Sequence, residues 1–454
     1  MSPGRAVVIG LARTGMALAR TLRADGYAVL VVDRADTPAL RDRAASLSPD
    51  IEVRLGGYPD DIATGASMVC PSPGVPWDAP ELRVARELGV PVRSEIDLVF
   101  ERCRGRIVGI TGTNGKTTTT SLVAAILARG DEPVHLGGNI GTPMLDRLGS
   151  VHAGDWVVLE LSSFQLETVE APRCSIACVL NVTPDHLDRH GDFEAYADLK
   201  RRIVPFASDA AVLGYDDEIT RSMADIAVCP VHYFGLGIDR RSGTTVRDGV
   251  VVSIEDRGPI PVLPVAGIPL FGAHNVLNVL AAVAVARAAG IAPTAIATAV
   301  RDFRAVPHRL QTVLEHDGIL WVNDSKATNT ESAVMALQSF AGRPIVWIGG
   351  GKGMGTSSDG LAAAVARSAR YAILNGESAA ELDRSLAAQG FADRVVVPTL
   401  RDAVLRAQAV ARPGDVVLLA PGFKSFDQFH DFEERGEVFS ALVHDATSAV
   451  EKTR

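Results

Sequence analysis

The residues with the most specific chemical potential form the glycine-rich stretch Gly112-Thr113-Asn114-Gly115-Lys116-Thr117-Thr118. When such a turn opens a helix, its backbone N–H groups point at an anion and the helix dipole favours negative charge. Lys116 can reach terminal phosphate oxygens, and the Thr117 hydroxyl can ligate Mg²⁺. The general phosphate-loop pattern has a glycine where Ile110 stands, so an ordinary glycine-rich turn with a surface lysine is the alternative.

The flanking residues predict the elements that position this loop. Arg106–Val108 is a short, largely β-branched run that is typical of a strand. Thr119–Arg129 carries Leu122 and Ile126 at helical spacing. The glycine-rich stretch is therefore expected between a strand and a helix N-terminus, which favours phosphate binding.

A carboxylate and a histidine follow two further predicted strands. The apolar run Trp156–Glu160 indicates a buried strand with Glu160 at its C-terminal end. A carboxylate beside a phosphate loop usually binds Mg²⁺ directly or through water, and the alternative is an ion pair with an arginine. The strand Val179–Val182 leads into Thr183–His190, where His186 lies between carboxylates. His186 could be a ligand, a base or a solvated side chain, and the residues alone leave this open.

The N-terminal section predicts a βαβ unit. Ala6–Ile9 indicates a strand, Gly10–Gly15 a turn, Met16–Ala24 a helix, and Val29–Asp33 a second strand that ends in a carboxylate. Ala12 stands where a dinucleotide fingerprint has its second glycine. A dinucleotide site, a site for another nucleotide and a purely structural turn all remain open.

Two helical patterns follow the phosphate-loop section. Phe193–Phe206 has a helical pattern that carries Lys200, and on the pattern alone Lys200 is a surface lysine. Leu270–Gly290 predicts a turn with His274 and Asn275, followed by an apolar helix. The polar start of that segment offers side chains for a base or a ribose.

The last section repeats one arrangement three times. Ile319–Val322, Pro344–Ile348 and Val416–Leu419 predict strands, and each strand precedes a polar or glycine-rich segment. Those segments are Asn323–Asn329, Gly349–Gly353 and Pro421–Phe429. Strands that alternate with helices imply a second doubly wound sheet, and such sheets bind ligands at the carboxyl ends of their strands.

Composition limits the classes of protein. A length of 454 residues suggests two to four domains, and a net charge of −9 argues against nucleic-acid binding. Five cysteines do not suggest a disulfide framework, and Cys174 and Cys178 lie in an apolar stretch that predicts core thiols. The uncharged stretch between Arg257 and Arg287 is broken by prolines and polar residues, so no membrane span is expected. No signal peptide is visible, so we expect a cytoplasmic protein that binds neither nucleic acid nor membrane and is a monomer.

Several strings together resemble the Mur ligase and folylpolyglutamate synthase superfamily, and most closely the glutamate-adding members of the Mur ligase family. In chain order they are Gly112–Thr118, Leu159–Glu167, Asn181–His190, Pro307–Arg309, Asn323–Asn329 and Asp427–Phe429. The resemblance implies an α/β protein of three domains. These are a Rossmann-like UDP-binding domain (1–95), a central phosphate-loop ATPase domain with a mixed or parallel sheet (96–304) and a Rossmann-like, amino-acid-binding C-terminal domain (305–454).

The resemblance also implies site residues. Those for the nucleotide-sugar substrate are Arg13, Thr14, Asp33, Arg34, Ser72, Pro73, Gly74, Asn139, Ser162, Gln165 and His186. ATP is matched by Gly112–Thr118 together with Asn275, Arg309 and Asp324. Two Mg²⁺ ions are assigned to Thr117, Glu160, His186 and Lys200, the last as a carbamate formed with CO₂. The incoming glutamate is matched by Lys326, Thr328, Lys352, Ser425, Phe426 and Phe432. The implied catalytic residues are Lys116, Glu160, His186, Lys200 and Arg309.

The implied activity is an ATP-dependent ligase reaction in peptidoglycan precursor synthesis, in which D-glutamate joins UDP-N-acetylmuramoyl-L-alanine through an acyl phosphate. A related ligase that uses L-glutamate or another amino acid is the first alternative. Folylpolyglutamate synthesis is a second alternative, against which Asn323–Asn329 argues. A nucleotide-binding scaffold that has lost catalysis is a third. Against it argue four intact residues, Lys116, Glu160, His186 and Lys200.

Overall fold

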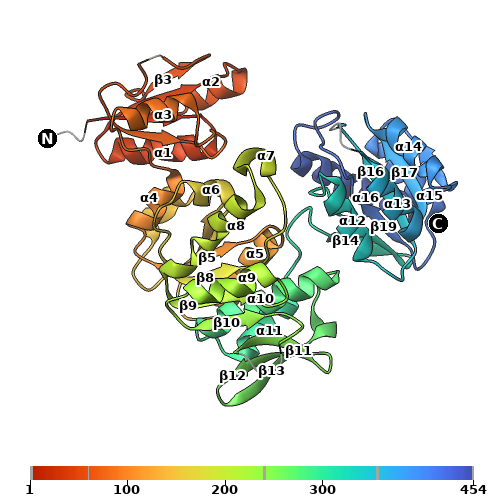
Figure 1. The fold of residues 1–454 in the computed structure, drawn as a ribbon. Coiled ribbons are helices and arrows are strands. Elements are labelled where there is room, and N and C mark those ends of the chain that lie inside the picture. The colour runs from red at the N-terminus through yellow and green to blue at the C-terminus, as the bar shows by residue number, and fades with distance from the viewer. Residues whose placement is uncertain (1–3, 60, 239–241, 354–356, 452–454) are drawn as a thin grey trace. The chain divides into compact units, whose positions relative to one another are not determined.

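The computed structural model describes residues 4–59, 61–238, 242–353 and 357–451. The chain divides into two compact units, Met1–Gly267 with Leu277–Arg301, and Ile268–Val276 with Asp302–Arg454. Figure 1 follows the chain from the red N-terminus to the blue C-terminus. The first unit holds a four-stranded and a nine-stranded sheet, and the second holds a six-stranded sheet. The predicted α/β architecture with three domains is confirmed.

The four-stranded sheet is wholly parallel, with the strand order β3-β2-β1-β4. Its strands are β1 (Arg5–Ile9), β2 (Ala28–Asp33), β3 (Glu52–Leu55) and β4 (Ala66–Pro71), and its helices are α1 (Arg13–Ala24), α2 (Pro38–Ala45) and α3 (Pro80–Glu87). Residues 6–9 of β1 are fully buried. Continuous apolar burial of this kind is typical of a parallel strand that is covered on both faces.

The nine-stranded sheet has the order β13-β12-β11-β10-β9-β8-β5-β7-β6, and only β11, β12 and β13 pair in the antiparallel sense. Its strands are β5 (Arg106–Thr111), β6 (Val134–Gly138), β7 (Trp156–Glu160), β8 (Cys174–Val179), β9 (Ala207–Gly214), β10 (Val231–Phe234), β11 (Gly243–Arg247), β12 (Val250–Glu255) and β13 (Gly258–Pro264). The helices of this part of the chain are α4 (Glu95–Arg102), α5 (Lys116–Leu127), α6 (Ser163–Glu167), α7 (Leu187–His190), α8 (Phe193–Arg201), α9 (Glu218–Ser222), α10 (Ala273–Ala288) and α11 (Pro293–Asp302). Because β5 lies between β7 and β8, the loops after these three strands meet at one edge of the sheet.

The six-stranded sheet has the order β14-β15-β19-β16-β17-β18, and only β14 is antiparallel to its neighbour. Its strands are β14 (Gln311–His316), β15 (Ile319–Asn323), β16 (Ile345–Gly350), β17 (Ala369–Asn375), β18 (Arg394–Val396) and β19 (Val416–Leu419). Its helices are α12 (Thr330–Gln338), α13 (Asp359–Ser368), α14 (Ala379–Ala388), α15 (Leu400–Val410) and α16 (Phe432–Glu451). The strand β19 lies between β15 and β16, so the loops after these three strands also share one edge.

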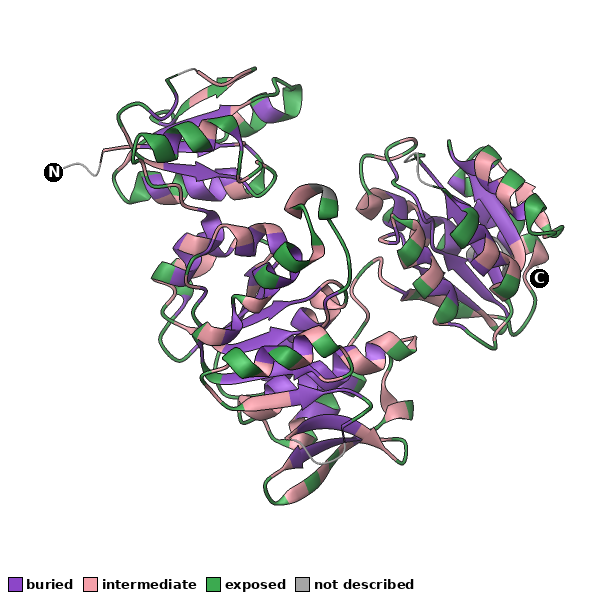
Figure 2. Cartoon of the chain, viewed as in Figure 1, coloured by how far each residue is buried: buried purple, intermediate pink, exposed green. Residues whose placement is uncertain are grey.

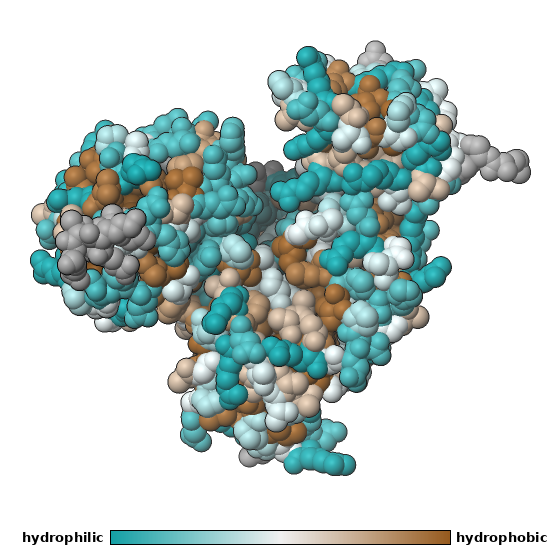
Figure 3. Space-filling view, turned by 180° about the vertical axis from the view of Figure 1, so that it is seen from behind, coloured by the Kyte–Doolittle hydropathy of each residue, from teal (hydrophilic) through white to brown (hydrophobic). Residues whose placement is uncertain are grey.

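The sheets form the cores of the units. In Figure 2 most of the strands are purple, whereas many helices carry green on their outer faces. The predicted core thiols Cys174 and Cys178 are buried in β8. Exposed apolar side chains such as Leu88 and Leu405 are spread over both units, and Figure 3 shows apolar surface interrupted by polar residues on the visible face. Scattered residues of this kind are normal for a folded protein.

Three predicted boundaries differ from the structure. α1 begins at Arg13, so Arg13 and Thr14 form its first turn instead of belonging to the glycine-rich turn. β6 extends to Gly138, into a segment that the sequence predicts as a turn from residue 137 to residue 141. α8 ends at Arg201, before a short 3₁₀ turn that contains Pro205, because proline has no N–H to continue the ladder.

In the described residues, no helix has both the length and the apolar character that a bilayer crossing requires.

Candidate active site

The glycine-rich loop has the predicted strand–loop–helix setting. It follows β5, and Gly115 is the N-cap of α5 with a φ of 84°. Only glycine suits this position, because any other residue would be strained at this positive φ and its Cβ would lie 2.2 Å from Asn278 Oδ1. Asn181, just after β8, holds the loop: its side chain accepts from Asn114 N at 2.9 Å and donates to Asn114 O at 3.1 Å. The loop is therefore a rigid ring of backbone groups at a helix N-terminus, which suits an anion.

Two lysines meet at one carbonyl oxygen of this loop. Lys116 Nζ donates to Gly112 O at 2.8 Å and to Thr113 O at 2.7 Å. Lys200 Nζ, from α8, donates to the same Gly112 O at 2.9 Å. Burial and then the charge of Lys116 lower the pKa of Lys200 to about 7. A large fraction of Lys200 is therefore the neutral amine at neutral pH.

The prediction that Lys200 is a surface lysine is wrong, since only 1% of it is exposed. Lys200 lies four residues after the buried Tyr196 and so shares its face of the helix. Tyr196 places its ring 4.4 Å from Lys200 Nζ and its hydroxyl 3.1 Å from Thr113 Oγ1. The apolar pattern predicted the buried face of this helix but left out the position of Lys200, which lies beside that face.

Glu160 ends β7 and is buried, as predicted. Ile110 of β5 pairs with Glu160, which brings the carboxylate to the edge where the glycine-rich loop begins. Its Oε1 accepts from Asn139 Nδ2 at 3.0 Å, whereas its buried Oε2 has no hydrogen-bond partner among the described residues. A buried carboxylate oxygen without a donor is costly, so this atom is suited to a cation.

His186 is the N-cap of α7, with a φ of 52°. Positive φ is uncommon for residues other than glycine and concentrates at functional sites. The ring packs against Phe164 of α6 at 4.9 Å, and its side chain is about half exposed. In the described residues no cluster of three or more histidine, cysteine, aspartate or glutamate side chains is arranged to hold a metal.

The N-terminal βαβ turn is held by two side chains that the sequence predicted as substrate contacts. Asp33 accepts from Leu11 N at 2.8 Å and from Ala35 N at 3.0 Å. Ser72 Oγ donates to Gly10 O at 3.0 Å. These bonds order the turn through which a nucleotide would be held.

Arg34, also predicted as a substrate contact, is largely exposed. It pairs with Glu81 at 3.0 Å and lies over the ring of Tyr58. Arg34 and Gly74 line one cavity, of about 430 Å³, with Tyr58 and Glu81.

A second cavity of the first unit lies between the loop after β4 and helix α6. It brings the predicted residues Ser72 and Pro73 together with Gln165. Ser162 and Gln165 form a capping box on α6, with Gln165 Oε1 accepting from Ser162 N at 3.1 Å and Ser162 Oγ accepting from Gln165 N at 3.3 Å. The cavity also borders Glu95, and burial raises the pKa of that carboxyl to about 7.

The second unit carries the remaining predicted residues of the ATP site. Asp324 follows β15 and is buried, and its Oδ1 accepts from Leu310 N at 3.1 Å. Burial raises the pKa of Asp324 to about 7, although the Leu310 N–H and the charge of Arg309 oppose this. Arg309 itself lies between His308 and Leu310, which both have positive φ. Asn275 is buried and donates to Phe271 O at 2.7 Å.

The predicted amino-acid residues lie on three loops of the second unit and, for Phe432, at the start of α16. Lys326 Nζ lies 3.8 Å from the centre of the Phe432 ring, and Thr328 follows on the same loop. Lys352 N donates to Lys424 O at 2.8 Å, which places the Lys352 loop beside the loop of the buried Ser425. Phe426 is 58% exposed.

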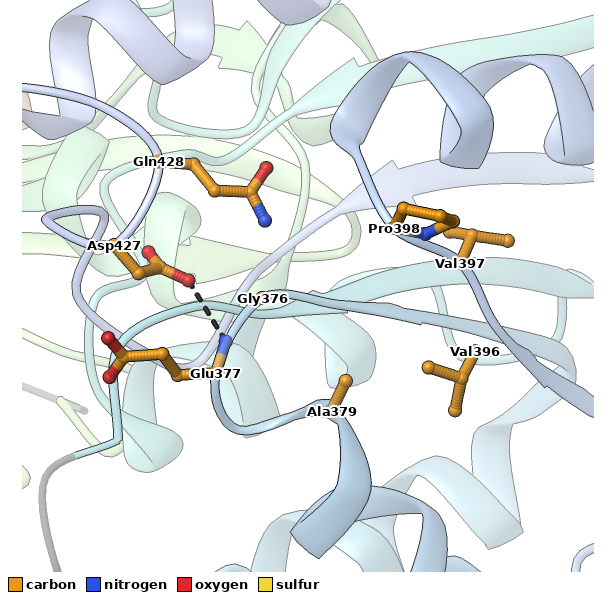
Figure 4. A pocket seen from close by; sticks show the side chains of 8 residues that line it. All are labelled: Gly376, Glu377, Ala379, Val396, Val397, Pro398, Asp427 and Gln428. Carbon is orange, nitrogen blue, oxygen red and sulfur yellow. Dashed lines mark hydrogen bonds between the residues drawn. The ribbon is translucent and has the colours of Figure 1, made fainter.

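A further cavity of the second unit, of about 530 Å³, lies at the ends of β17 and β18. Figure 4 shows its lining, in which Asp427 Oδ2 accepts from Glu377 N at 3.1 Å. The lining consists of Gly376, Glu377, Ala379, Val396, Val397, Pro398, Asp427 and Gln428. None of these is a predicted site residue, although Asp427 directly follows the predicted contact Phe426.

Sequence reasoning missed the supporting roles of Asn181 and Tyr196. Asn181 lies two residues after the end of β8 and holds the glycine-rich loop through both the oxygen and the nitrogen of its side-chain amide. Its position after a buried strand next to the loop strand was the available signal. Tyr196 had a signal too, since its spacing of four from Lys200 places both side chains on one helix face.

Comparison with known families gives three matches in chain order. The Mur ligase MurD-like N-terminal domain matches residues 4–94, the Mur ligase middle domain matches 110–286, and the Mur ligase glutamate ligase domain matches 308–423.

Similar curated proteins match over almost their whole length. A UDP-N-acetylmuramoylalanine–D-glutamate ligase of Acidobacterium capsulatum is 43% identical over 444 residues, covering 97% of this chain and 96% of the relative. A protein of the same name from Pelotomaculum thermopropionicum is 40% identical over 447 residues, covering 97% of both chains.

Solved structures share the fold at lower identity. The UDP-N-acetylmuramate–alanine ligase MurC of Thermotoga maritima matches with a TM-score of 0.61 at 20% identity, covering 98% of this chain and all of that one. A MurF structure from Acinetobacter baumannii matches with a TM-score of 0.62 at 19% identity, covering 96% of this chain and 93% of that one. Three domain matches in the right order and relatives of this identity over the full length show that the chain belongs to the Mur ligase family.

Proposed function

We propose that this chain is an ATP-dependent ligase that joins D-glutamate to UDP-N-acetylmuramoyl-L-alanine in peptidoglycan precursor synthesis. The observation that carries the proposal is the 43% identity, over 97% of the chain, to a relative named for this reaction. The glycine-rich loop with Lys116 supports the use of ATP, because it presents backbone N–H groups and a cation to phosphate oxygens.

ATP is proposed to bind with its phosphates on residues 112–118. Lys116 would leave the carbonyls that it now contacts and donate to the terminal phosphate. Asn275, Arg309 and Asp324 are assigned to the adenine, phosphate and ribose side. Phosphoryl transfer depends mainly on positioning and charge neutralisation, which these side chains can provide.

The residues around the loop fit Mg²⁺. The unpartnered Oε2 of Glu160 and the Thr117 hydroxyl are hard oxygen donors of the kind that Mg²⁺ prefers. We assign two ions to Thr117, Glu160, His186 and a carbamate of Lys200. When bound, Mg²⁺ would neutralise phosphate charge.

Lys200 is proposed to carry the carbamate. The reaction joins the Lys200 nitrogen to the carbon of CO₂, moves one C=O electron pair onto oxygen and releases a proton from nitrogen. It requires the neutral amine, which the lowered pKa of about 7 supports. The carbamate N–H can still donate to Gly112 O, and the new anion would face the cation of Lys116.

The chemistry then has two steps. The alanyl carboxylate attacks the terminal phosphorus of ATP, which gives an acyl phosphate and releases ADP. The amine of glutamate attacks the acyl carbon, and the tetrahedral intermediate expels phosphate and forms the amide. Exclusion of water is required, because water would hydrolyse the acyl phosphate.

The nucleotide-sugar substrate is assigned to the N-terminal turn and to the cavity that joins Ser72 and Pro73 to Gln165. Arg13, Thr14, Asp33, Arg34, Gly74, Asn139 and Ser162 complete this assignment. Glutamate is assigned to Lys326, Thr328, Lys352, Ser425, Phe426 and Phe432. We further propose that the protein acts in the cytoplasm, where ATP is available, and that it is a monomer.

The test is ligation by the purified protein with ATP, Mg²⁺ and UDP-N-acetylmuramoyl-L-alanine. Phosphate release is followed with D-glutamate, with L-glutamate and without an amino acid, and the product is weighed by mass spectrometry. Product with D-glutamate alone is expected. Product with L-glutamate alone would keep the reaction and change the amino acid, and no product with either would contradict the proposal.

A further inference from the structure

Arg435, on the first turn of α16, is a buried cation of the second unit. Only 3% of it is exposed. Its guanidinium donates to Ser325 Oγ and to Ser325 O, both at 2.9 Å, and to Phe423 O at 3.1 Å. All three acceptors are uncharged, and no described carboxylate pairs with it as a salt bridge.

Burying such a charge is costly. Burial lowers the pKa of Arg435 to about 10, against the opposing charge of Asp427, so the side chain stays cationic at neutral pH. A buried cation with neutral partners regains less electrostatic free energy than one in an ion pair. The burial of Arg435 is therefore weak evidence that this residue stabilises the fold. Its geometry gives a better reason for its presence.

Arg435 donates hydrogen bonds to two separate loops and lies beside a third. Ser325 belongs to the loop after β15, and Phe423 belongs to the loop after β19. The third loop follows β16: a Cβ on Gly351 would lie 3.2 Å from Arg435 Nη1 and 2.3 Å from Lys424 O. Gly351 has a φ of 144°, so a side chain here would strain the backbone as well as displace the guanidinium.

These three loops carry the proposed amino-acid contacts. Lys326 directly follows Ser325, Ser425 lies two residues after Phe423, and Lys352 follows Gly351. The hydrogen bond from Lys352 N to Lys424 O ties the second loop to the third. The side chain of Arg435 therefore lies where it can set the separation between the three contacts.

We propose that Arg435 is a positioning residue that sets the spacing of the amino-acid site by fixing these three loops around one planar guanidinium. The proposal rests on the proposed function, since it takes the glutamate contacts from there. Arginine is required because its fork reaches several acceptors in fixed directions, whereas the ammonium of lysine is a single point charge.

The test compares Arg435→Lys with the control Arg370→Lys in the complete enzyme. Arg370 is a partly buried arginine of the same unit that pairs with Asp415 and touches none of the three loops. We expect Arg435→Lys to raise the KM for D-glutamate by about tenfold to a hundredfold, the range expected when hydrogen bonds to a charged group are lost. The KM for the nucleotide-sugar should stay unchanged, and the control should change neither this constant nor the KM for glutamate. An unchanged KM for glutamate, or equal shifts in the KM values for glutamate and the nucleotide-sugar, would overturn the proposal.

A second variant and a second measurement decide the matter if Arg435→Lys does not fold. Ser325→Ala removes one acceptor of Arg435, and with it the hydrogen bond from Ser325 Oγ to Phe432 O, but leaves the guanidinium in place. A smaller rise in the KM for D-glutamate is expected, and no rise would overturn the proposal. Hydrogen–deuterium exchange of the three loops should quicken in either variant while α13 and α14 stay protected, and unchanged loop exchange would also overturn it. Hydrogen–deuterium exchange does not depend on turnover, so it tests the positioning role even if the enzyme is inactive in the assay. A failure of the proposed reaction would instead appear as inactivity of the wild type.

Discussion

Lys116 and Lys200 donate to the same acceptor, the carbonyl oxygen of Gly112, at 2.8 and 2.9 Å. Two ammonium groups this close repel each other, and the buried one loses its proton more easily. This explains why the pKa of Lys200 falls to about 7, first through burial and then through the charge of Lys116. This difference supports the proposed division of roles, in which Lys116 stays a cation for phosphate and Lys200 reacts with CO₂.

Replacing Lys200 by alanine should reduce kcat by about a hundredfold to a thousandfold, the usual effect of removing one preorganised electrostatic group. A short carboxylic acid such as acetate should restore part of the activity, because its two oxygens can occupy the place of the carbamate. The measurement is the rate of phosphate release with and without acetate.

The matched control for this rescue is Lys116→Ala. That variant should be inactive as well, but acetate should not help it, because the lost group is a cation. Unchanged ligation by Lys200→Ala would contradict a carbamate on Lys200. Equal rescue of both variants by acetate would contradict different roles for the two lysines.

Glu160→Gln should raise the Mg²⁺ concentration needed for half-maximal activity by at least about tenfold, in line with the effect of changes around metal ligands. The reason is that the unpartnered Oε2 would lose its charge. Titration of activity with Mg²⁺ measures this. Glu132→Gln, at an exposed site, serves as the control and should leave the titration unchanged; an unaltered midpoint in Glu160→Gln would show that this carboxylate does not serve the metal.

Gly115→Ala should weaken ATP binding and lower the melting temperature. The left-handed backbone costs an alanine about 1–2 kcal/mol, and its Cβ would also meet Asn278 Oδ1 at 2.2 Å. The double variant Gly115→Ala/Asn278→Ala should recover the steric part alone, which a double-mutant cycle of melting temperatures isolates.

Gly65→Ala is the control for strain without a clash. Gly65 has a φ of 69° and open space around its missing Cβ. The Gly65→Ala variant should lose only the stability that placing an alanine in the left-handed region costs, and it should bind ATP normally. If Gly115→Ala behaves like Gly65→Ala in both respects, the contact with Asn278 does not constrain the loop.

Asp324→Asn should be more stable than the wild type at high pH. The pKa of Asp324 is raised to about 7 in the folded protein, so the folded state holds this proton more tightly than the unfolded state. The stability that this provides is complete below about pH 4 and is lost as the pH rises through about 7. Between about pH 5 and about pH 8 the variant should therefore gain up to roughly 3 kcal/mol on the wild type, at about 1.4 kcal/mol per unit.

Urea unfolding of both proteins at the two pH values measures this gain. The exposed Asp393→Asn in the same unit is the control and should follow the wild type at both values. A constant difference between Asp324→Asn and the wild type across this range would contradict a raised pKa at Asp324.

Local patterns predicted the elements that position the site. The glycine-rich loop, the buried strand that ends at Glu160 and the strand Val416–Leu419 all follow from short runs of apolar or glycine residues. Such runs specify an element because burial on both faces of a parallel strand requires continuous apolar residues. The three-domain α/β architecture followed from the resemblance of longer strings.

Other features depend on contacts between distant residues. The burial of Lys200 depends on the carbonyl of Gly112, which lies 88 residues away in the sequence. The link from Arg435 to Ser325 spans 110 residues. No periodicity within a helix reveals such partners, because they are set by the order of strands in the sheet. The start of α1 at Arg13 was missed for a local reason, since no side chain caps that helix.

The most direct test of the account follows oxygen from the substrate into phosphate. UDP-N-acetylmuramoyl-L-alanine labelled with oxygen-18 in its alanyl carboxylate is incubated with the enzyme, ATP, Mg²⁺ and D-glutamate, and the released phosphate and the product are analysed by mass spectrometry. We expect one labelled oxygen in each phosphate and one fewer in the amide product, because the acyl phosphate passes its bridging oxygen to the leaving group. Unlabelled phosphate alongside ligated product would contradict the acyl phosphate, and labelled substrate recovered without any product would contradict the proposed reaction itself.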